Sequence, residues 1–139
     1  MPERGTLVVD VDGTLCPIKG EGERYEDLVP HGAMLRRLKA WHAEGWRIVL
    51  YTSRNMRSFD GNIGLINKHT APTLLDWLAR WQVPFDEIHF AKPWAGHEGF
   101  YVDDRAVRPD ELLANSAEQL TAIVEAGRAR LRAAGDDGA

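Results

Sequence analysis

Two aspartates two positions apart close an apolar run near the start of the sequence. The stretch "LVVDVDGTLC", residues 7–16, contains Asp10 and Asp12, and the Gly13 that follows them ends the run. Acids held close together repel each other unless they are protonated or gathered around a cation, and Mg²⁺ prefers such hard oxygen ligands. Two aspartates at this spacing are common in turns. Their interpretation therefore depends on whether the rest of the chain carries other groups suited to the same chemistry.

Three later stretches offer further groups for phosphate chemistry, in the order "LYTSR", "AKPW" and "YVDD". The first carries the hydroxyl of Thr52 and the second the ammonium of Lys92, and both can stabilise negative charge in a transition state. The third carries two more acids, Asp103 and Asp104. Because Mg²⁺ takes few protein ligands and leaves room for a phosphate oxygen, the whole set predicts a phosphate-processing site with Mg²⁺ as cofactor.

The two aspartates of the first stretch can divide one reaction between them. Asp10 can attack phosphorus directly and form an aspartyl-phosphate, which replaces one difficult step by two easier ones. Asp12 can protonate the leaving oxygen and later activate the water that hydrolyses the intermediate. We therefore predict that Asp10 is a nucleophile and Asp12 a general acid/base.

The elements that position these groups alternate between strand and helix. Short β-branched apolar runs predict strands, the first buried on both faces, and apolar residues at helical spacing predict helices. The predicted strands are residues 6–11, 47–54, 86–90 and 100–103, and the predicted helices are residues 33–44, residues 73–81 and a last one that begins with a capping box of Ser116 and Gln119.

This alternation predicts an α/β fold, a three-layer Rossmann-like parallel sheet with helices on both faces, in a single domain over residues 1–139. Ligands of such sheets bind outside the carboxyl ends of the strands. The predicted strands carry these groups at or near their carboxyl ends: Asp10 and Asp12 on the first, Thr52 on the second, and Asp103 and Asp104 on the last. We therefore expect them on one edge of the sheet.

Composition narrows the class of partner. The 139 residues carry a formal net charge of −4, which repels a polyanion, so we expect no nucleic acid partner. The single cysteine, Cys16, permits no intramolecular disulfide, and the N-terminal "MPERGTLVVD" lacks the long apolar run of a signal peptide or membrane span. We expect a cytoplasmic protein that does not associate with membranes.

The four stretches, in this order between residues 6 and 104, resemble the motifs of the haloacid dehalogenase superfamily of phosphohydrolases. The resemblance implies that Asp10 is the nucleophile and Asp12 the general acid/base, with the backbone carbonyl of Asp12 also facing Mg²⁺. It implies that Thr52 and Lys92 hold the transferring phosphoryl group. It also implies metal ligands among the later acids: Asp103 is the first candidate, and Asp104 either binds through water or orients Lys92.

Within that superfamily, the small size and the stretches "SRNMRSFDGNIGLINKHT" and "KPWAGHEGFYVDDRAVRP" are similar to the capsular polysaccharide biosynthesis phosphatases. The resemblance implies a small phosphorylated substrate, a sugar phosphate used in surface polysaccharide synthesis. Larger relatives insert a cap domain, for which this chain has little room, so we expect an uncapped site. An open site admits a bulky substrate or is covered by a neighbouring subunit, and we hypothesise a homo-oligomer.

Residues 53–70 are long, polar and glycine-bearing for a connection, and we interpret them as a substrate loop. Arg54, beside Thr52, is predicted to contact phosphate through two parallel hydrogen bonds. Arg57, Asn55 and Asn67 are candidates for contacts with the rest of the substrate, although a loop that satisfies its own backbone explains them equally well.

Two other functions fit parts of the pattern. A polynucleotide 3'-phosphatase would use a similar uncapped domain, but the acidic balance argues against it. A phospho-accepting signalling domain also combines Asp, Thr or Ser, and Lys on a parallel α/β sheet. In such a domain the accepting aspartate ends the third strand, whereas here the paired acids end the first.

Overall fold

The computed structural model describes residues 4–135. The chain divides into two compact units, Met1–Trp94 and Ala95–Ala139. The expectation of a single domain over residues 1–139 stays a prediction.

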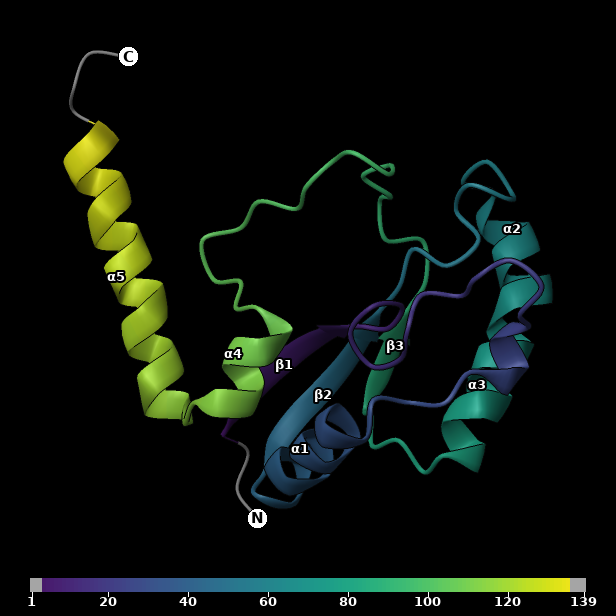
Figure 1. Ribbon diagram of the computed structural model, residues 1–139, viewed down its shortest axis with the longest axis horizontal. Coiled ribbons are helices and arrows are strands. Elements are labelled where there is room, and N and C mark those ends of the chain that lie inside the picture. The colour runs from purple at the N-terminus through teal and green to yellow at the C-terminus, as the bar shows by residue number, and fades with distance from the viewer. Residues whose placement is uncertain (1–3, 136–139) are drawn as a thin grey trace. The chain divides into compact units, whose positions relative to one another are not determined.

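The first unit is built on a parallel sheet of three strands, which confirms the α/β class. The strands β1 (Gly5–Asp10), β2 (Trp46–Tyr51) and β3 (Glu87–His89) lie in that order across the sheet (Figure 1). Asp10 is opposite Tyr51, and Tyr51 is opposite His89, so the three strands end at the same edge.

Helices flank this sheet, as expected for a Rossmann-like fold. Helix α1 (Gly32–Ala43) packs against β2, and Figure 1 shows it in front of that strand, with helix α3 (Ala71–Arg80) to the side of β3. The buried residues of these helices recur at helical spacing, as the sequence predicts: Met34, Leu38 and Trp41 in α1, and Leu74, Trp77 and Leu78 in α3. Pro72 stands in the first turn of α3, where it costs no hydrogen bond.

The prediction that the first strand is buried on both faces is wrong. Val9 is buried and Leu7 is half-buried, but Thr6 and Val8 are exposed, and Val8 retains 64% of its accessible surface. Side chains of a strand point alternately to the two faces of the sheet. Strand β1 is therefore buried on one face only. Its unbroken run of apolar residues did not indicate burial on both faces.

The interpretation of residues 53–70 as one long loop is also wrong for its second half. After a series of turns, the chain becomes helical from Ile63, first in α2 (Ile63–Leu65) and then in the π-helix η2 (Ile66–Thr70), which runs into α3. The side chain of Asn62 caps this segment by accepting the N–H of Leu65 at 3.1 Å. Ile66 is fully buried and supplies the apolar anchor.

The second unit contains α4 (Pro109–Ala114) and α5 (Ala117–Gly135). The capping box predicted before the last helix is confirmed: Ser116 N donates to Gln119 Oε1 at 2.8 Å, and Gln119 N donates to Ser116 Oγ at 3.2 Å. The strand predicted at residues 100–103 is absent from the described chain, which is irregular there, with Phe100 and Val102 exposed. A strand needs a neighbouring strand for its backbone hydrogen bonds, and a run of three apolar residues does not supply one.

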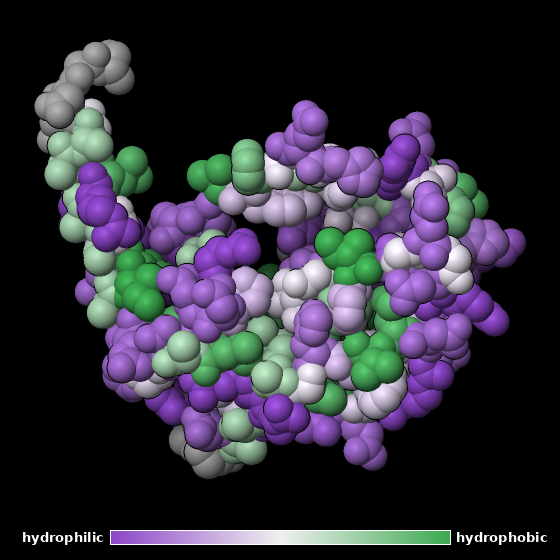
Figure 2. All heavy atoms as spheres, in the orientation of Figure 1, coloured by the Kyte–Doolittle hydropathy of each residue, from purple (hydrophilic) through white to green (hydrophobic). Residues whose placement is uncertain are grey.

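The surface seen in Figure 2 carries mostly hydrophilic residues, with smaller apolar patches between them. Among the described residues, 4–135, no helix combines the length and the apolarity that crossing a bilayer requires.

Candidate active site

Three of the predicted site residues meet at the carboxyl edge of the sheet in the first unit. Asp10 is the last residue of β1, and Thr52 directly follows β2. Lys92 follows β3 by three residues. The expectation that these residues share one edge is confirmed for this unit, because parallel strands bring their carboxyl ends together.

Asp10 lies between a cation and a hydroxyl. Lys92 Nζ is 3.5 Å from Asp10 Oδ1, and Thr14 Oγ1 donates to Asp10 Oδ2 at 3.3 Å. Burial raises the pKa of the Asp10 carboxyl, and the neighbouring Lys92 opposes that rise only in part. Each carboxylate oxygen has one of these contacts, and a carboxylate has about four acceptor sites, so lone pairs remain for a further partner.

The backbone around Thr52 fixes Lys92 beside Asp10. Thr52 N donates to His89 O at 3.0 Å, and Lys92 N donates to Thr52 O, also at 3.0 Å. These bonds continue the pairing of β2 and β3 past the ends of the strands. Ala91, just before Lys92, has a φ of 63°, a left-handed conformation that is strained for a residue with a β-carbon. Strain of this kind persists where surrounding contacts hold the chain, which is common in functional loops.

A tight turn after β1 brings the second aspartate back toward the sheet edge. The amides of Thr14, Leu15 and Cys16 all donate to Val11 O, at 3.1, 2.8 and 3.2 Å. Gly13 has a φ of 90°, which glycine adopts without strain. The sequence "DVDGT" therefore forms a turn rather than a continuing strand, and this turn carries Asp12.

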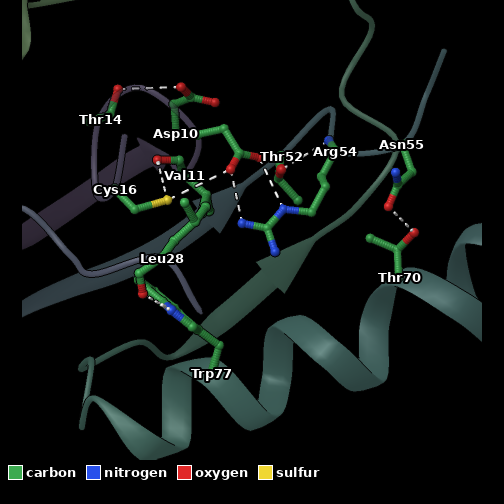
Figure 3. A network of polar contacts seen from close by, with 11 residues as sticks. Asp10, Val11, Thr14, Cys16, Leu28, Thr52, Arg54, Asn55, Thr70 and Trp77 are labelled. Carbon is green, nitrogen blue, oxygen red and sulfur yellow. Dashed lines mark hydrogen bonds and ion pairs between the residues drawn. The ribbon is translucent and has the colours of Figure 1, made fainter. Parts of the chain in front are cut away.

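Asp12 forms a two-point ion pair with Arg54, whose side chain reaches across from the end of β2 (Figure 3). Arg54 Nε donates to Asp12 Oδ2 at 3.1 Å, and Arg54 Nη2 donates to Asp12 Oδ1 at 2.9 Å. Arg54 is 5% exposed. Its predicted two-point contact is thus present in the structure, but with a carboxylate of the protein. Its contact with phosphate stays a prediction.

Thr52 is almost completely buried, with 1% of its surface exposed. Its Oγ1 accepts the backbone N–H of Arg54 at 3.0 Å, which leaves its own O–H to donate. A hydroxyl at this strand end has the chemistry needed to donate to a phosphoryl oxygen.

Asp103 and Asp104 belong to the second unit, in its irregular segment. Asp103 Oδ1 accepts the N–H of Arg105 at 2.8 Å. Asp104 Oδ2 accepts from Arg128 Nε at 3.0 Å and from Arg128 Nη2 at 2.6 Å. These hydrogen bonds from Arg128 lower the pKa of Asp104. The roles of both acids as metal ligands stay predictions.

Two residues near the acids were not singled out from the sequence. Thr14, which contacts Asp10, stands within "DVDGT", so the turn that follows β1 was a usable signal for it. Tyr25 places its ring 4.1 Å from the guanidinium carbon of Arg54. Nothing in the pattern of residues 17–30 marks Tyr25, because that segment lacks the periodicity of a helix or strand.

The segment that carries Tyr25 is tied down at several points. His31 N donates to Leu15 O at 2.8 Å, which joins the two ends of the segment. Trp77 Nε1 of α3 donates to Leu28 O at 2.7 Å within the protein interior (Figure 3). The position of the Tyr25 ring is therefore set by the fold of the first unit.

No protein-family model matches the sequence, and no curated protein sequence matches it significantly. The structure is similar to the crystal structure of an MCSG target from Vibrio cholerae, with a TM-score of 0.82 and 43% sequence identity. The match covers 88% of this chain and 98% of the Vibrio cholerae chain.

Proposed function

We propose that this chain, which belongs to the same family as the Vibrio cholerae protein, is a Mg²⁺-dependent phosphomonoesterase of the haloacid dehalogenase type with an uncapped site. The observation that carries the proposal is the grouping of Asp10, Thr52 and Lys92 at one sheet edge, with Lys92 Nζ 3.5 Å from Asp10 Oδ1. A carboxylate beside an ammonium and a buried hydroxyl provides a nucleophile together with donors for the group it attacks.

In the first step, a carboxylate oxygen of Asp10 attacks phosphorus, and the bond between phosphorus and the substrate's alcohol oxygen breaks. The electron pair of that bond leaves with the alcohol oxygen, which takes a proton from Asp12. Lys92 and Thr52 donate hydrogen bonds to the phosphoryl oxygens and stabilise the negative charge on these oxygens in the transition state. The products of this step are an alcohol and an aspartyl-phosphate on Asp10.

In the second step, water attacks the same phosphorus and gives one proton to Asp12. The bond between phosphorus and Asp10 breaks, and its electron pair restores the carboxylate. Inorganic phosphate leaves, and Asp12 again carries the proton that it gave up in the first step. Asp12 therefore acts once as an acid and once as a base.

The donor set at the β1 end fits Mg²⁺, although no group of three His, Cys, Asp or Glu side chains is arranged for a metal within residues 4–135. Mg²⁺ commonly takes only one or two carboxylates and completes its shell with water and substrate oxygens. Asp10 and the carbonyl of Asp12 would hold it here, with Asp103 and Asp104 as further proposed ligands. When bound, Mg²⁺ neutralises charge on the phosphoryl group.

The proposed substrate is a small sugar phosphate of surface or capsular polysaccharide synthesis, by the resemblance to the capsular polysaccharide biosynthesis phosphatases. A net charge of −4 supports a small substrate over a nucleic acid. The single cysteine supports a reducing, cytoplasmic setting. The uncapped site supports a homo-oligomer, in which a neighbouring subunit covers it. Sedimentation at micromolar concentration tests this oligomeric state.

A phosphate-release screen with Mg²⁺ tests the proposed function. The panel contains sugar phosphates, nucleotides and 3'-phosphorylated oligonucleotides. We expect turnover of one or more sugar phosphates and little or none of the oligonucleotides. Preference for the oligonucleotides would support the polynucleotide 3'-phosphatase, and a stable phosphoprotein without turnover would support the phospho-accepting domain. Absence of both turnover and phosphoprotein would exclude all three functions.

A further inference from the structure

The guanidinium of Arg54 is committed to Asp12. Two of its three nitrogens, Nε and Nη2, donate to the two different oxygens of the Asp12 carboxylate, at 3.1 and 2.9 Å. Two parallel bonds between a planar fork and a planar carboxylate fix both the direction of the carboxylate and its rotation, which one bond does not. The side chain that the proposed mechanism uses as acid and base is therefore held in one orientation.

The Arg54 side chain is itself fixed from several directions. The ring of Tyr25 lies against its guanidinium at 4.1 Å, a favourable cation–π distance. Its backbone N–H donates to Thr52 Oγ1 at 3.0 Å. The next residue, Asn55, has a left-handed φ of 62°, and its Oδ1 accepts from Thr70 Oγ1 at 2.8 Å (Figure 3). The chain direction on both sides of Arg54 is thus set by contacts outside the ion pair.

Stability does not explain why the Arg54 guanidinium is buried in this pair, in which the Arg54 side chain is 2% exposed and that of Asp12 is 22% exposed. The third nitrogen, Arg54 Nη1, is buried and has no hydrogen-bond partner. A buried donor without an acceptor is unfavourable, and removing the charge of Arg54 from water offsets much of what the ion pair gains. The pair lies at the edge that carries the proposed nucleophile, and the orientation that it imposes on Asp12 accounts for its presence there.

We propose that Arg54 is a positioning residue, which holds the Asp12 carboxylate where it exchanges protons with the leaving alcohol and the attacking water, and that Tyr25 holds Arg54. The proposal rests on the proposed phosphomonoesterase function and assigns a role that its mechanism leaves open. It differs from the sequence-based expectation, in which Arg54 binds phosphate, and the two assignments predict different kinetics.

p-Nitrophenyl phosphate separates these two roles, because its phenolate leaves without a proton. Formation of the aspartyl-phosphate then does not need Asp12, whereas its hydrolysis does. We expect Arg54→Met to show a burst of about one equivalent of p-nitrophenolate per site, followed by steady-state release at least about tenfold slower than in the wild type. We expect KM not to rise, and phosphoenzyme to accumulate after an acid quench.

Matched variants separate positioning from general damage. Arg36→Met makes the same change at an exposed position of α1 and should behave like the wild type. Arg54→Lys keeps a charge but loses the two-point contact, so it should show the same burst. Tyr25→Phe keeps the aromatic ring and should behave like the wild type. Tyr25→Leu should also show a burst, with a smaller reduction of the steady-state rate than in Arg54→Met. These Tyr25 variants carry the test if Arg54→Met does not fold.

The inference is overturned if Arg54→Met raises KM and slows the first release of p-nitrophenolate without accumulating phosphoenzyme. That result would mean that Arg54 binds the phosphate of the substrate. Equal behaviour of Tyr25→Leu and the wild type overturns the part assigned to Tyr25. A wild-type protein that forms neither phosphate nor phosphoenzyme from any monoester excludes the proposed function itself. The failure of the function is thus separate from the failure of the Arg54 assignment.

Discussion

Lys92 Nζ lies 3.5 Å from Asp10 Oδ1, although 82 positions separate the two residues in the sequence. The contact follows from the parallel register of the three strands and from the bond between Lys92 N and Thr52 O. It joins the nucleophile predicted at the first strand to the cation predicted after the third. Substitutions on either side of this contact therefore test the proposed chemistry directly.

Replacing the proposed nucleophile should abolish turnover and leave the fold intact. Asp10→Asn is nearly isosteric, and we expect phosphate release to fall by a factor of about 10⁴ or more, because the amide cannot form the covalent intermediate. Asp12→Asn should lower the rate of phosphate release by a factor of about 10²–10⁴, because the proton transfers lose their acid and base. Phosphate release measures both, with circular dichroism to check folding. Substantial residual turnover in Asp10→Asn would contradict the assignment.

Removing the cation beside Asp10 should lower the rate. We expect Lys92→Met to reduce kcat/KM by a factor of about 10²–10³, because one preorganised donor to the phosphoryl oxygens is lost. Lys39→Met, at an exposed position of α1, is the matched control and should leave kcat/KM unchanged. Equal rates for the two variants would remove Lys92 from the site.

Turnover should depend on a divalent cation. Excess EDTA is expected to stop phosphate release, and added Mg²⁺ to restore it, because the carboxylate of Asp10 and the phosphate both carry negative charge. The melting temperature in EDTA serves as the control for unfolding. Full activity in excess chelator would exclude Mg²⁺ as the cofactor.

Asp86 should contribute stability that depends on pH. Its Oδ2 accepts the N–H of Ile48 at 2.8 Å, and this bond lowers its pKa below the usual 3.8. A carboxyl whose pKa is lower in the folded state stabilises above its unfolded pKa, and the contribution disappears as the pH falls through the folded pKa. We expect Asp86→Ala to cost about 1 kcal/mol at pH 6 in urea unfolding.

The control is to compare the free energies of unfolding of Asp86→Ala and the wild type at acidic pH. The difference between Asp86→Ala and the wild type should shrink below about pH 4, the ordinary range of an aspartate pKa. A difference that stays constant down to pH 2 would mean that the aspartate acts through packing and not through its charge.

The Cys16 thiol should be unreactive in the folded protein. Burial raises its pKa to about 12, so at pH 8 roughly one thiol in ten thousand is ionised. We expect no reaction with Ellman's reagent at pH 8 until urea unfolds the chain, after which one thiol per chain should react. Rapid labelling of the native protein would show that this residue is accessible.

Much of this arrangement was predictable, because it depends on local patterns. Strand-end placement follows from parallel pairing, so the strand pattern alone is enough to place Asp10 and Thr52 at one edge. The capping box of Ser116 and Gln119 needs only residues three apart, and it formed as expected.

Other features depend on partners that a sequence does not display. The expected strand at residues 100–103 has no neighbouring strand in the described chain, so its apolar residues could not identify it reliably. The contact between Arg54 and Asp12 was missed because a long side chain at residue 54 can reach many partners, and only the folded geometry shows that Asp12 is one of them.

The bond between His31 N and Leu15 O joins the two ends of residues 16–30, so this stretch leaves the scaffold and returns to it at almost the same place. Doubling the length of a flexible loop between such fixed points costs only about 0.6 kcal/mol in closure entropy. The exposed tip of this stretch, residues 20–24, is therefore a suitable graft point: a longer insert there changes what enters the site without displacing Tyr25 or the acids at the end of β1.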